Sequence, residues 1–398
     1  MLLIMKKGEN HMKNQQKKRI LIISAANPTR AYSGLKYLFF ELKKRKNNVI
    51  IWASVPKCQS EEYRKWGNNA QSFMFNILGS LPKIRKIWRN IKAFLVILEY
   101  RREVIICHEL TFYKLCTYIK KIFPDTVIIH YCTELFDENS PKYFQKQLKF
   151  YEQHANVPDL IIECDEMRRI FRKKKYCISK PTVTIYNTLP ENELKKFLKE
   201  KKNIHEIPII TYTGAAYGHR QLNIIVSAVK KINTPFHLNL FVYGPKHSIE
   251  ELEKLCLTEL GKDKFTIIVD TPREELFDRV VNSDIGIVYY NPLLSIGNKY
   301  ASPTKFFEYV AMGIPVVSSN NDSLMNLIDK YNLGVYVKDQ TVLSLTQCIT
   351  KLLEDCDLRK KISINEMKAF HDVLCYEIQS KKAFEQIEKL VYNKGFEL

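Results

Sequence analysis

The sequence SPTKFFEYVAMGIPVVSSN, residues 302–320, has the pattern of a helix followed by a buried strand. Ser302 is a good N-cap residue and Pro303 suits the first helical position, so the helix is expected to begin there. Gly313 is expected to close the helix in the left-handed conformation, and Pro315 prevents its continuation. The apolar, β-branched residues that follow predict a strand. This stretch is therefore one helix–strand unit of an α/β fold.

Short apolar runs alternate with longer amphipathic segments over most of the 398 residues. The runs are nearly continuous and rich in β-branched residues, which is typical of parallel strands covered on both faces. Two series are expected as strands: 19–24, 48–54, 103–108, 126–131, 159–164 and 182–187, then 209–214, 237–244, 265–270, 285–290, 314–319 and 333–338. They predict an α/β protein with two Rossmann-like, doubly wound parallel-sheet domains that face each other across a cleft.

A polar, charged segment bounded by prolines separates the two series. We expect an N-terminal domain at 19–190, a linker at 191–208 and a C-terminal domain at 209–375. Residues 376–398 are expected to form a helix that packs back on the N-terminal domain. Residues 1–18 are expected to be a disordered leader, because their apolar stretch precedes the positive charges and is too short for a signal peptide.

The chain is strongly basic, with 62 lysines and arginines against 43 aspartates and glutamates, a formal net charge of +19. Such a charge favours nucleic acid, an anionic membrane surface or a phosphorylated substrate. The charge is scattered and accompanies no nucleic-acid-binding motif, so no nucleic-acid partner is expected. The ten cysteines contain no CxxC pair, which argues against a zinc site or a disulfide framework and favours a cytoplasmic location.

The segment 81–102 is a candidate membrane contact. One helical stripe carries apolar residues, and most of the lysines and arginines lie elsewhere on the helix; the stripe contains Ile84, Ile87, Trp88, Ile91, Leu95 and Leu98. A basic amphipathic helix with a tryptophan can lie on an anionic bilayer, which would place the protein peripherally at the inner face of the membrane. The alternative is an ordinary helix packed on its sheet. No run reaches the roughly 18 apolar residues of a spanning helix.

Five separated motifs of the C-terminal half resemble, in order and spacing, those of the family 4 (group 1) glycosyltransferases, which have the GT-B fold. They are YTGAAYGHRQLNIIVSAV at 212–229, LNLFVYGP at 238–245, TPREELFDRVVNSDIGIVYYNP at 271–292, the stretch at 302–320 and NLGVYV at 332–337. The resemblance implies transfer of a sugar from a nucleotide-sugar donor to a glycan or lipid-linked acceptor in polysaccharide or glycoconjugate biosynthesis, with retention of configuration. It implies no cofactor and no metal, because the nucleotide sugar is itself the substrate.

The start of the 302–320 helix is the expected diphosphate site. Free N–H groups at a helix N-terminus bind anions, so Ser302 and Thr304 are candidates for donor binding. The partial positive charge of the helix N-terminus disfavours a lysine such as Lys305 there. A diphosphate bound beside Lys305 would compensate for that unfavourable interaction. The resemblance implies that Glu308 accepts hydrogen bonds from the ribose hydroxyls of the donor. The alternative is an exposed ion pair between Lys305 and Glu308, three positions apart.

Other donor-binding candidates follow the strands of the second series. Gly214 and Gly244 stand at strand ends, where glycine permits close approach of a ligand to the backbone. The family carries an arginine directly after the first glycine and a lysine five residues later. Here these places are Ala215 and Arg220, so Arg220 is expected to grip the leaving diphosphate. A sugar-contacting glutamate of the family is replaced by Tyr300; Asn298 is expected to substitute for it.

The N-terminal domain is expected to hold the acceptor. Ser33 and Gly34, near the start of a helix, lie in the first strand-to-helix loop. His108 and Glu109 end one strand, and Glu134 follows the next, in a place where relatives carry a His-Glu pair and this chain has Thr133-Glu134.

Glycosyl transfer has an oxocarbenium-like transition state, and negative charge grows on the departing diphosphate. Arg220, Lys305 and the helix start would stabilise that charge. In a retaining reaction the leaving phosphate takes the acceptor proton. An inverting enzyme would instead need a base, for which Glu134, Glu109 and His108 are the candidates.

Two other functions remain open at this point. A sugar-nucleotide 2-epimerase shares the two Rossmann-like domains, although the order of the motifs argues against it. A catalytically inactive, nucleotide-binding scaffold would explain the departures at Ala215, Tyr300 and Thr133.

Overall fold

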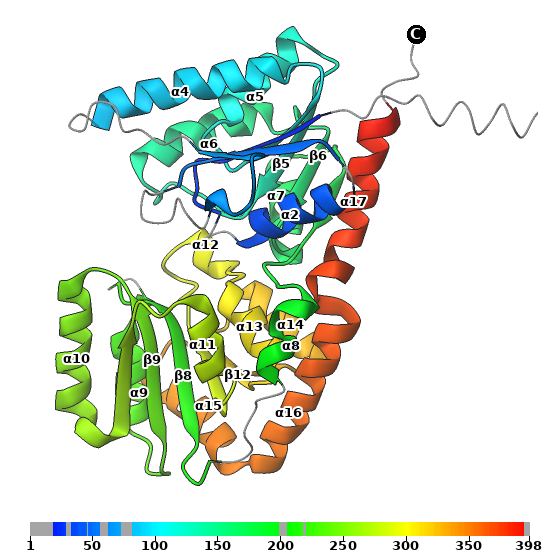
Figure 1. Ribbon diagram of the computed structural model, residues 1–398. Helices are drawn as coiled ribbons and strands as arrows, with labels where there is room; N and C mark the ends of the chain where they lie inside the picture. The colour runs from blue at the N-terminus through cyan, green and yellow to red at the C-terminus, as the bar shows by residue number, and fades with distance from the viewer. Residues whose placement is uncertain are drawn as a thin grey trace, which may run out of the picture. The chain divides into compact units, whose positions relative to one another are not determined.

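The computed structural model describes residues 19–28, 33–45, 47–55, 63–72, 82–198, 205–217 and 220–393. The chain divides into two compact units (Figure 1). Unit 1 comprises Met1–Cys164, Arg169–Ile185 and Ser380–Leu398, and unit 2 comprises Asp165–Arg168 and Tyr186–Gln379. The expected leader at 1–18 lies outside the described residues.

Unit 1 is built on a parallel sheet of seven strands in the order β3-β2-β1-β4-β5-β6-β7. The strands are β1 (Ile20–Ile23), β2 (Val49–Ala53), β3 (Ala70–Ser72), β4 (Val104–His108), β5 (Val127–Cys132), β6 (Leu160–Glu163) and β7 (Thr182–Thr184). Every residue of β1, β4, β5 and β6 is buried, as continuous apolar strands require. The strand order reverses between β1 and β4, and doubly wound sheets commonly bind ligands at such a switch point.

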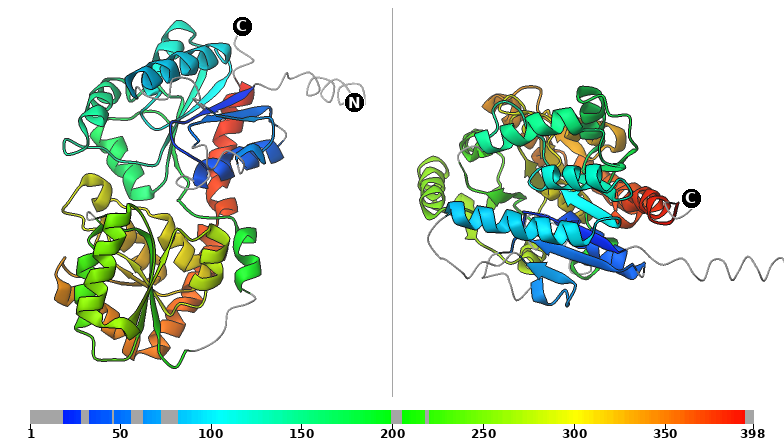
Figure 2. Two further views of the ribbon diagram at one scale, coloured as in Figure 1. Left: turned by 60° about the vertical axis from the view of Figure 1, so that its left-hand side comes forward. Right: turned by 90° about the horizontal axis from the view of Figure 1, so that it is seen from above.

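Helices cover both faces of this sheet, which explains why its central strands are mostly apolar. They are α2 (Ser33–Lys44), α4 (Pro82–Glu99), α5 (Tyr113–Ile122), α6 (Lys142–His154), α7 (Glu166–Lys175) and the end of α17 (Tyr376–Asn393). On one face, α5 lies between α4 and α6 (Figures 1 and 2). On α17, Glu388 accepts a hydrogen bond from Arg45 at 2.8 Å, which ties the end of this helix to the region following α2.

Unit 2 is built on a parallel sheet of six strands in the order β10-β9-β8-β11-β12-β13. The strands are β8 (Ile209–Ala215), β9 (His237–Tyr243), β10 (Phe265–Val269), β11 (Ile285–Val288), β12 (Val316–Ser318) and β13 (Gly334–Tyr336). Its α-helices are α8 (Glu191–Leu198), α9 (Leu222–Lys230), α10 (Lys246–Leu260), α11 (Arg273–Val280), α12 (Ile296–Lys299), α13 (Thr304–Met312), α14 (Asp322–Tyr331), α15 (Val342–Glu354), α16 (Cys356–Ala369) and the start of α17. Helix α9 contacts α10 and α15, and their apolar faces form one core with the sheet.

The α/β class and the two parallel, doubly wound sheets are confirmed. Each of the twelve predicted strands is present, and one strand was missed. That strand, β3, has the sequence AQS and pairs only with β2 at the edge of the sheet. An edge strand of three small or polar residues carries no apolar run that could predict it.

The units divide at other places than the sequence analysis expected. Part of the expected linker, 191–208, is the helix α8, which belongs to unit 2. Leu194 and Phe197, three positions apart on α8, are buried. The ring of Phe197 packs edge-on against Phe277 of α11, with centroids 5.5 Å apart. The short segment Asp165–Arg168 also belongs to unit 2, where Ser323 donates a hydrogen bond of 2.7 Å to Asp165.

The helix predicted from 302–320 is α13, and its start needs a correction. Ser302 is not the N-cap: the cap is Pro303, which has extended backbone angles and no side-chain hydrogen bond. Proline disfavours the helical conformation in the residue before it, and here it also stays outside the helix itself. At the other end Gly313 caps α13 in the left-handed conformation, as predicted, with φ of 62°.

Helix α4 carries two apolar faces. One face packs into the core of unit 1 through Ala93, Val96 and Ile97, and Tyr100, directly after the helix, joins the same core. The predicted stripe lies largely outside that contact: Trp88 is 50% exposed, Ile91 43% and Leu95 57%. The stripe is therefore not the face by which α4 packs on its sheet. No helix among the described residues is both long and apolar enough to cross a membrane.

Candidate functional site

Lys305 is a buried cation without an ion pair. It lies in the first turn of α13 and is only 6% exposed. Its Nζ lies 3.7 Å from the centre of the Tyr212 ring and 5.6 Å from that of Tyr290. Within the described parts of the chain no carboxylate pairs with it. Burial, and then the charge of Arg220, lower the pKa of Lys305 well below its usual value, while Glu308 raises it.

Gly214, at the end of β8, faces this lysine. Its φ of +142° is a conformation that only glycine adopts easily. A Cβ atom at this position would lie 2.8 Å from the Lys305 Nζ and 3.2 Å from the Tyr212 hydroxyl. The glycine therefore leaves room for the ammonium group at the carboxyl end of the central strand, where open α/β sheets bind ligands.

Arg220 is the second cation of this cluster. Its guanidinium carbon lies 4.8 Å from the centre of the Tyr290 ring, so Tyr290 contacts both positive groups. Two cations held close together by aromatic faces repel each other, and a bound anion would relieve that repulsion. The sequence analysis named Lys305 and Arg220 but missed Tyr212 and Tyr290. Their signal was a tyrosine near the carboxyl end of β8 and another just beyond β11.

Glu308 is buried, and its partner is an arginine that the sequence analysis did not consider. Arg273, the first residue of α11, places Nη1 2.8 Å from Oε1 of Glu308. The Nε of Arg273 donates to Glu193 of α8 at 3.0 Å. The alternative of an exposed pair between Lys305 and Glu308 is therefore wrong. Among the described residues the other oxygen of Glu308 has no hydrogen-bond partner, so it is free to accept one from a ligand.

The loop before α13 is held by internal hydrogen bonds. The side-chain amide of Asn298 donates to the backbone carbonyl of Asn291 at 3.0 Å. The backbone carbonyl of Asn298 accepts from the side-chain amide of Asn321 at 3.1 Å. The carbonyl of Tyr300 accepts from Arg168 at 2.5 Å. Asn298 thus uses part of its hydrogen-bonding capacity to fix the loop. Its expected role as a substitute for the missing glutamate stays a prediction.

The remaining donor-binding candidates lie beside this cluster. The carbonyl of the buried Ser302 accepts a hydrogen bond of 2.7 Å from Asn187. Thr304 is the first residue of α13, whose N–H groups receive no side-chain cap. Gly244 directly follows β9 with φ of +150°, and a Cβ there would lie 3.7 Å from the Ala216 nitrogen. Unit 2 therefore gathers Gly214, Arg220, Lys305 and Glu308 around the end of β8 and the start of α13.

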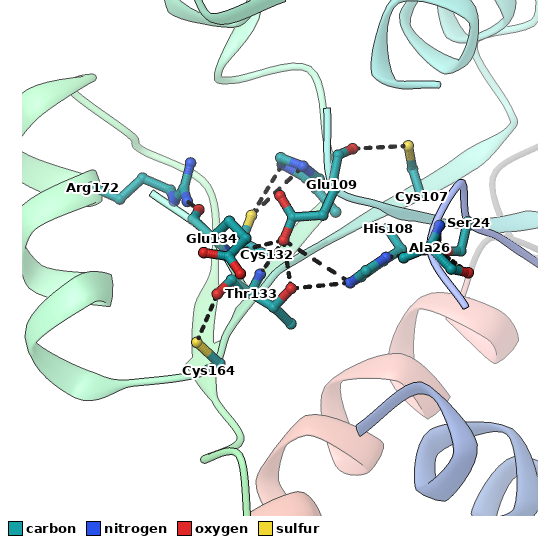
Figure 3. Close-up of polar contacts among 11 residues, drawn as sticks. Ser24, Ala26, Cys107, His108, Glu109, Cys132, Thr133, Glu134, Cys164 and Arg172 are labelled. Atoms are coloured by element: carbon teal, nitrogen blue, oxygen red, sulfur yellow. Dashed lines mark hydrogen bonds and ion pairs between the residues drawn. The ribbon is translucent and has the colours of Figure 1, made fainter. Parts of the chain in front are cut away.

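The candidates of unit 1 that follow or end β4 and β5, namely His108, Glu109 and Glu134, belong to one polar network (Figure 3). Glu109 has left-handed backbone, with φ of 58°. Its Oε1 accepts hydrogen bonds from the Thr133 nitrogen at 2.5 Å, the Thr133 hydroxyl at 2.6 Å and the Glu134 nitrogen at 2.8 Å. Glu109 thereby fixes the backbone that follows β5 and presents Glu134, which is half-buried.

His108 is enclosed within this network. Its Nδ1 lies 2.9 Å from the Ser24 hydroxyl and its Nε2 lies 3.1 Å from the Thr133 hydroxyl. The ring has no exposed surface, and burial lowers the pKa of His108 to about 3. It is therefore neutral at ordinary pH, and any acceptor would have to displace a neighbour to reach it. Its predicted role as a base stays untested, and this geometry favours Glu134.

The other two candidates of unit 1 lie at the start of α2. A Cβ atom on Gly34 in α2 would overlap the Tyr131 hydroxyl of β5, so glycine lets the helix approach the sheet. Ser33 is the first residue of α2. Arg172, which lies in a basic run, is buried: it pairs with Glu163 and donates to the Glu134 carbonyl at 2.9 Å. In the described residues no three His, Cys, Asp or Glu side chains are placed to hold a metal ion.

Comparison with known proteins identifies the C-terminal half. Residues 194–369 match the model of the family described as glycosyl transferases group 1. A comparison with curated protein sequences finds no match. The family match favours a transferase over an epimerase, since the fold is common to both.

Several solved structures share the fold over nearly the whole chain. A glycosyltransferase from Rickettsia africae ESF-5 has a TM-score of 0.72 at 15% identity, covering 95% of this chain and 100% of that one. Anabaena Alr3699/HepE in complex with UDP and glucose has a TM-score of 0.68 at 14% identity, with 94% and 100% covered. Sucrose-phosphate synthase from Thermosynechococcus elongatus has a TM-score of 0.71 at 14% identity, with 94% and 99% covered. Residues 194–369 therefore form a glycosyl transferases group 1 domain, and the chain is a glycosyltransferase with the GT-B fold.

Proposed function

We propose that this transferase moves a sugar from a nucleotide-sugar donor to a glycan or lipid-linked acceptor, in polysaccharide or glycoconjugate biosynthesis. The observation that carries the donor proposal is the ammonium group of Lys305, which is buried and has no ion pair among the described residues. A buried cation is costly unless a negative group compensates it. A diphosphate at the start of α13 would supply that group and would also meet the uncapped N–H groups of the helix. The structure of Alr3699/HepE with UDP and glucose supports the same class of ligand.

In this proposal each residue of the cluster acts on one part of the donor. Lys305 and Arg220 contact the diphosphate and stabilise the negative charge that grows on it. Glu308, oriented by Arg273, accepts hydrogen bonds from the ribose hydroxyls with its free oxygen. Arg273 then also balances the charge of the buried carboxylate. The sequence gives no sign of this pairing, because Arg273 and Glu308 come from different helices, α11 and α13.

The reaction breaks the bond between the sugar C1 and the phosphate oxygen and forms one between C1 and the acceptor oxygen. With retention, the acceptor proton passes to the leaving phosphate on the same face, so no protein base is required. With inversion, a base of unit 1 must take that proton, and Glu134 is the best placed candidate because His108 is enclosed. The product analysis of the transfer reaction distinguishes the two outcomes.

A screen of nucleotide sugars tests the donor proposal. Thermal unfolding is measured with UDP, GDP, ADP and CMP sugars; a ligand at 100 times its dissociation constant adds about 2.7 kcal/mol of stability. The nucleotide sugars of one nucleobase are expected to stabilise the wild-type protein against thermal unfolding. They are expected to stabilise an Arg220→Ala variant much less. Absence of stabilisation by all four classes would contradict the proposal.

The apolar face of α4 supports a peripheral association with the cytoplasmic face of a membrane. Its exposed residues form a stripe on a protein of formal charge +19, so apolar contact and attraction to anionic lipid can act together. The test is flotation with phosphatidylglycerol and phosphatidylcholine vesicles. A triple serine variant of Trp88, Ile91 and Leu95 is expected to lose binding to the anionic vesicles. A control changes three apolar residues of unit 2 that are more exposed than those of the stripe to serine and is expected to float like wild type; it uses Leu293, Leu343 and Ile364. Equal flotation of both variants would refute the assignment to α4.

A further inference from the structure

Unit 1 contains a cavity of about 360 Å³ between α4, α5 and α6. These three helices lie next to one another on one face of the sheet (Figure 1). The cavity lies within unit 1, whereas the proposed donor residues belong to unit 2. The lining side chains that matter here are Asn90, Lys114, Tyr118, Lys146, Gln147 and Phe150.

The charge of this cavity is entirely positive. Lys114 of α5 and Lys146 of α6 line it, and no aspartate or glutamate does. Among the described residues neither lysine forms an ion pair. The Nζ of Lys114 lies 5.4 Å from the centre of the Phe150 ring and 5.7 Å from that of Tyr118. Two unpaired ammonium groups at the same concave site favour an anion, because the opposite charge is missing from the protein itself.

The rest of the lining suits a ligand with hydroxyl groups and an apolar surface. The side-chain oxygen of Gln147 is buried and has no hydrogen-bond partner in the described parts of the chain, so a donor from a ligand or water would suit it. Asn90 adds a second carboxamide on the same cavity. Tyr118 and Phe150 lie edge to face with their ring centres 5.9 Å apart, and they offer aromatic surface next to these polar groups.

We propose that this cavity binds an anionic sugar, one that carries a phosphate or a carboxylate group. The lysines would hold the anion, the carboxamides would bond the hydroxyls, and the aromatic rings would contact the C–H face of the sugar. A volume of about 360 Å³ lies at the small end of ligand pockets, which suits one sugar with its anionic group. That the sugar belongs to the acceptor rests on the proposed function, whereas binding itself does not.

Binding is measured without any nucleotide sugar, so the test is independent of transferase activity. Glucose 6-phosphate is titrated against the full chain by saturation-transfer NMR, with glucose and inorganic phosphate as separate probes. The site variant is Lys114→Ala with Lys146→Ala. The matched control is Lys142→Ala with Lys149→Ala, which removes two exposed lysines of α6 that do not line the cavity.

Wild type is expected to bind glucose 6-phosphate more tightly than either glucose or phosphate. The site variant is expected to lose about tenfold or more in affinity, because two charge-assisted contacts are removed, and the control to stay within about twofold. Gln147→Leu is expected to reduce the preference for glucose 6-phosphate over inorganic phosphate. Measurable binding of glucose 6-phosphate with equal affinity in wild type and the site variant overturns the proposal. Equal binding of phosphate and glucose 6-phosphate by wild type overturns the sugar part of it.

Vesicles distinguish a lipid headgroup from a free sugar as the source. Phosphatidylinositol carries a phosphate and a polyol ring, whereas phosphatidylglycerol has a similar charge without the ring. One outcome is that wild type binds phosphatidylinositol vesicles more strongly than phosphatidylglycerol vesicles and that the site variant loses this preference. If wild type also fails to bind free glucose 6-phosphate, the site is assigned to a lipid headgroup of the proposed chemistry. Failure of both probes to show dependence on the two lysines refutes the site.

Discussion

Lys305→Met is expected to weaken donor binding strongly and yet to leave the free protein at least as stable as wild type. Replacing a buried ion pair with apolar side chains of similar volume is often neutral or stabilising, by about 1–4 kcal/mol, and we expect the same direction for the single buried ammonium group of Lys305. The lost contact with the Tyr212 ring, 3.7 Å from the ammonium, costs about 0.5–2 kcal/mol. The net change is therefore close to zero or favourable. Each kcal/mol corresponds to roughly 2–4 °C in Tm for a domain of this size.

The same substitution removes a charge-assisted contact to the diphosphate. Such contacts contribute about 1.5–3 kcal/mol, which is a loss of roughly 10- to 150-fold in affinity. Urea unfolding gives the stability, and calorimetric titration with the nucleoside diphosphate found in the screen gives the affinity. Lys330→Met, at an exposed lysine of α14, is the control and is expected to change neither. A Lys305→Met protein that is more than about 2 kcal/mol less stable, or binds the nucleotide like wild type, would refute the reasoning.

The pH dependence of Lys305 follows from its lowered pKa. The folded protein binds this proton less tightly than the unfolded chain, whose lysine pKa is 10.5. Between the lowered folded pKa and 10.5 the unfolded chain therefore holds more protons, and this group makes stability rise with pH. Lys305→Met should remove that rise. A bound diphosphate favours the ammonium form, so nucleotide binding should take up protons and weaken as the pH increases; calorimetry in buffers of different ionisation enthalpy measures the uptake.

Three other outcomes are expected. Gly214→Ala should lose nucleotide affinity and about 1–3 kcal/mol of stability, because its φ of +142° and the Lys305 Nζ at 2.8 Å leave no room for a Cβ; urea unfolding and titration measure both, and normal binding would contradict it. Glu308→Gln should lower the affinity for the nucleoside diphosphate but not that for inorganic pyrophosphate, since only the ribose contact is lost. An equal loss of affinity for both ligands would refute the ribose assignment. His108 should show no titration above about pH 5 in NMR, because burial lowers its pKa to about 3; an observed midpoint near 6 would disprove its enclosure.

The strands were predictable because the central strands of a parallel sheet covered by helices are mostly apolar. The runs that became β1, β4, β5 and β6 are buried throughout, so their sequence alone identified them. Glycine 313 was predictable for a related reason, since few residues close a helix in the left-handed conformation. These features depend on local chemistry, which the sequence displays directly.

The site was predictable only in part. Lys305, Arg220 and Glu308 follow from their motifs, whereas the partners of these residues come from other elements. Arg273 reaches Glu308 from α11, and Tyr290 contacts both cations from beyond β11. Nothing in the local pattern gives such pairings. The burial of Lys305 was equally hidden, because lysine is almost always exposed.

Helix α4 shows the same limit in its packing. The apolar stripe at 81–102 was visible in the sequence, but a second apolar face of α4 is the one that packs into the core of unit 1. This second face has helical spacing of its own, through Ala93, Val96 and Ile97 and on to Tyr100 just after the helix. Periodicity alone therefore could not tell which of the two faces would be buried. The exposed stripe is a result that only the packing of unit 1 could give.

The most direct test of the account is the rate of sugar transfer by the two cation variants. Single-turnover transfer is measured with the donor from the screen, for wild type, Arg220→Ala, Lys305→Met and the control Lys330→Met. Stabilisation of charge on a leaving group contributes about 100-fold or more per contact. The account predicts a loss of at least this size in both cation variants and an unchanged rate in the control. Full transfer activity in either Arg220→Ala or Lys305→Met would contradict the central claim that these cations hold the diphosphate of the donor.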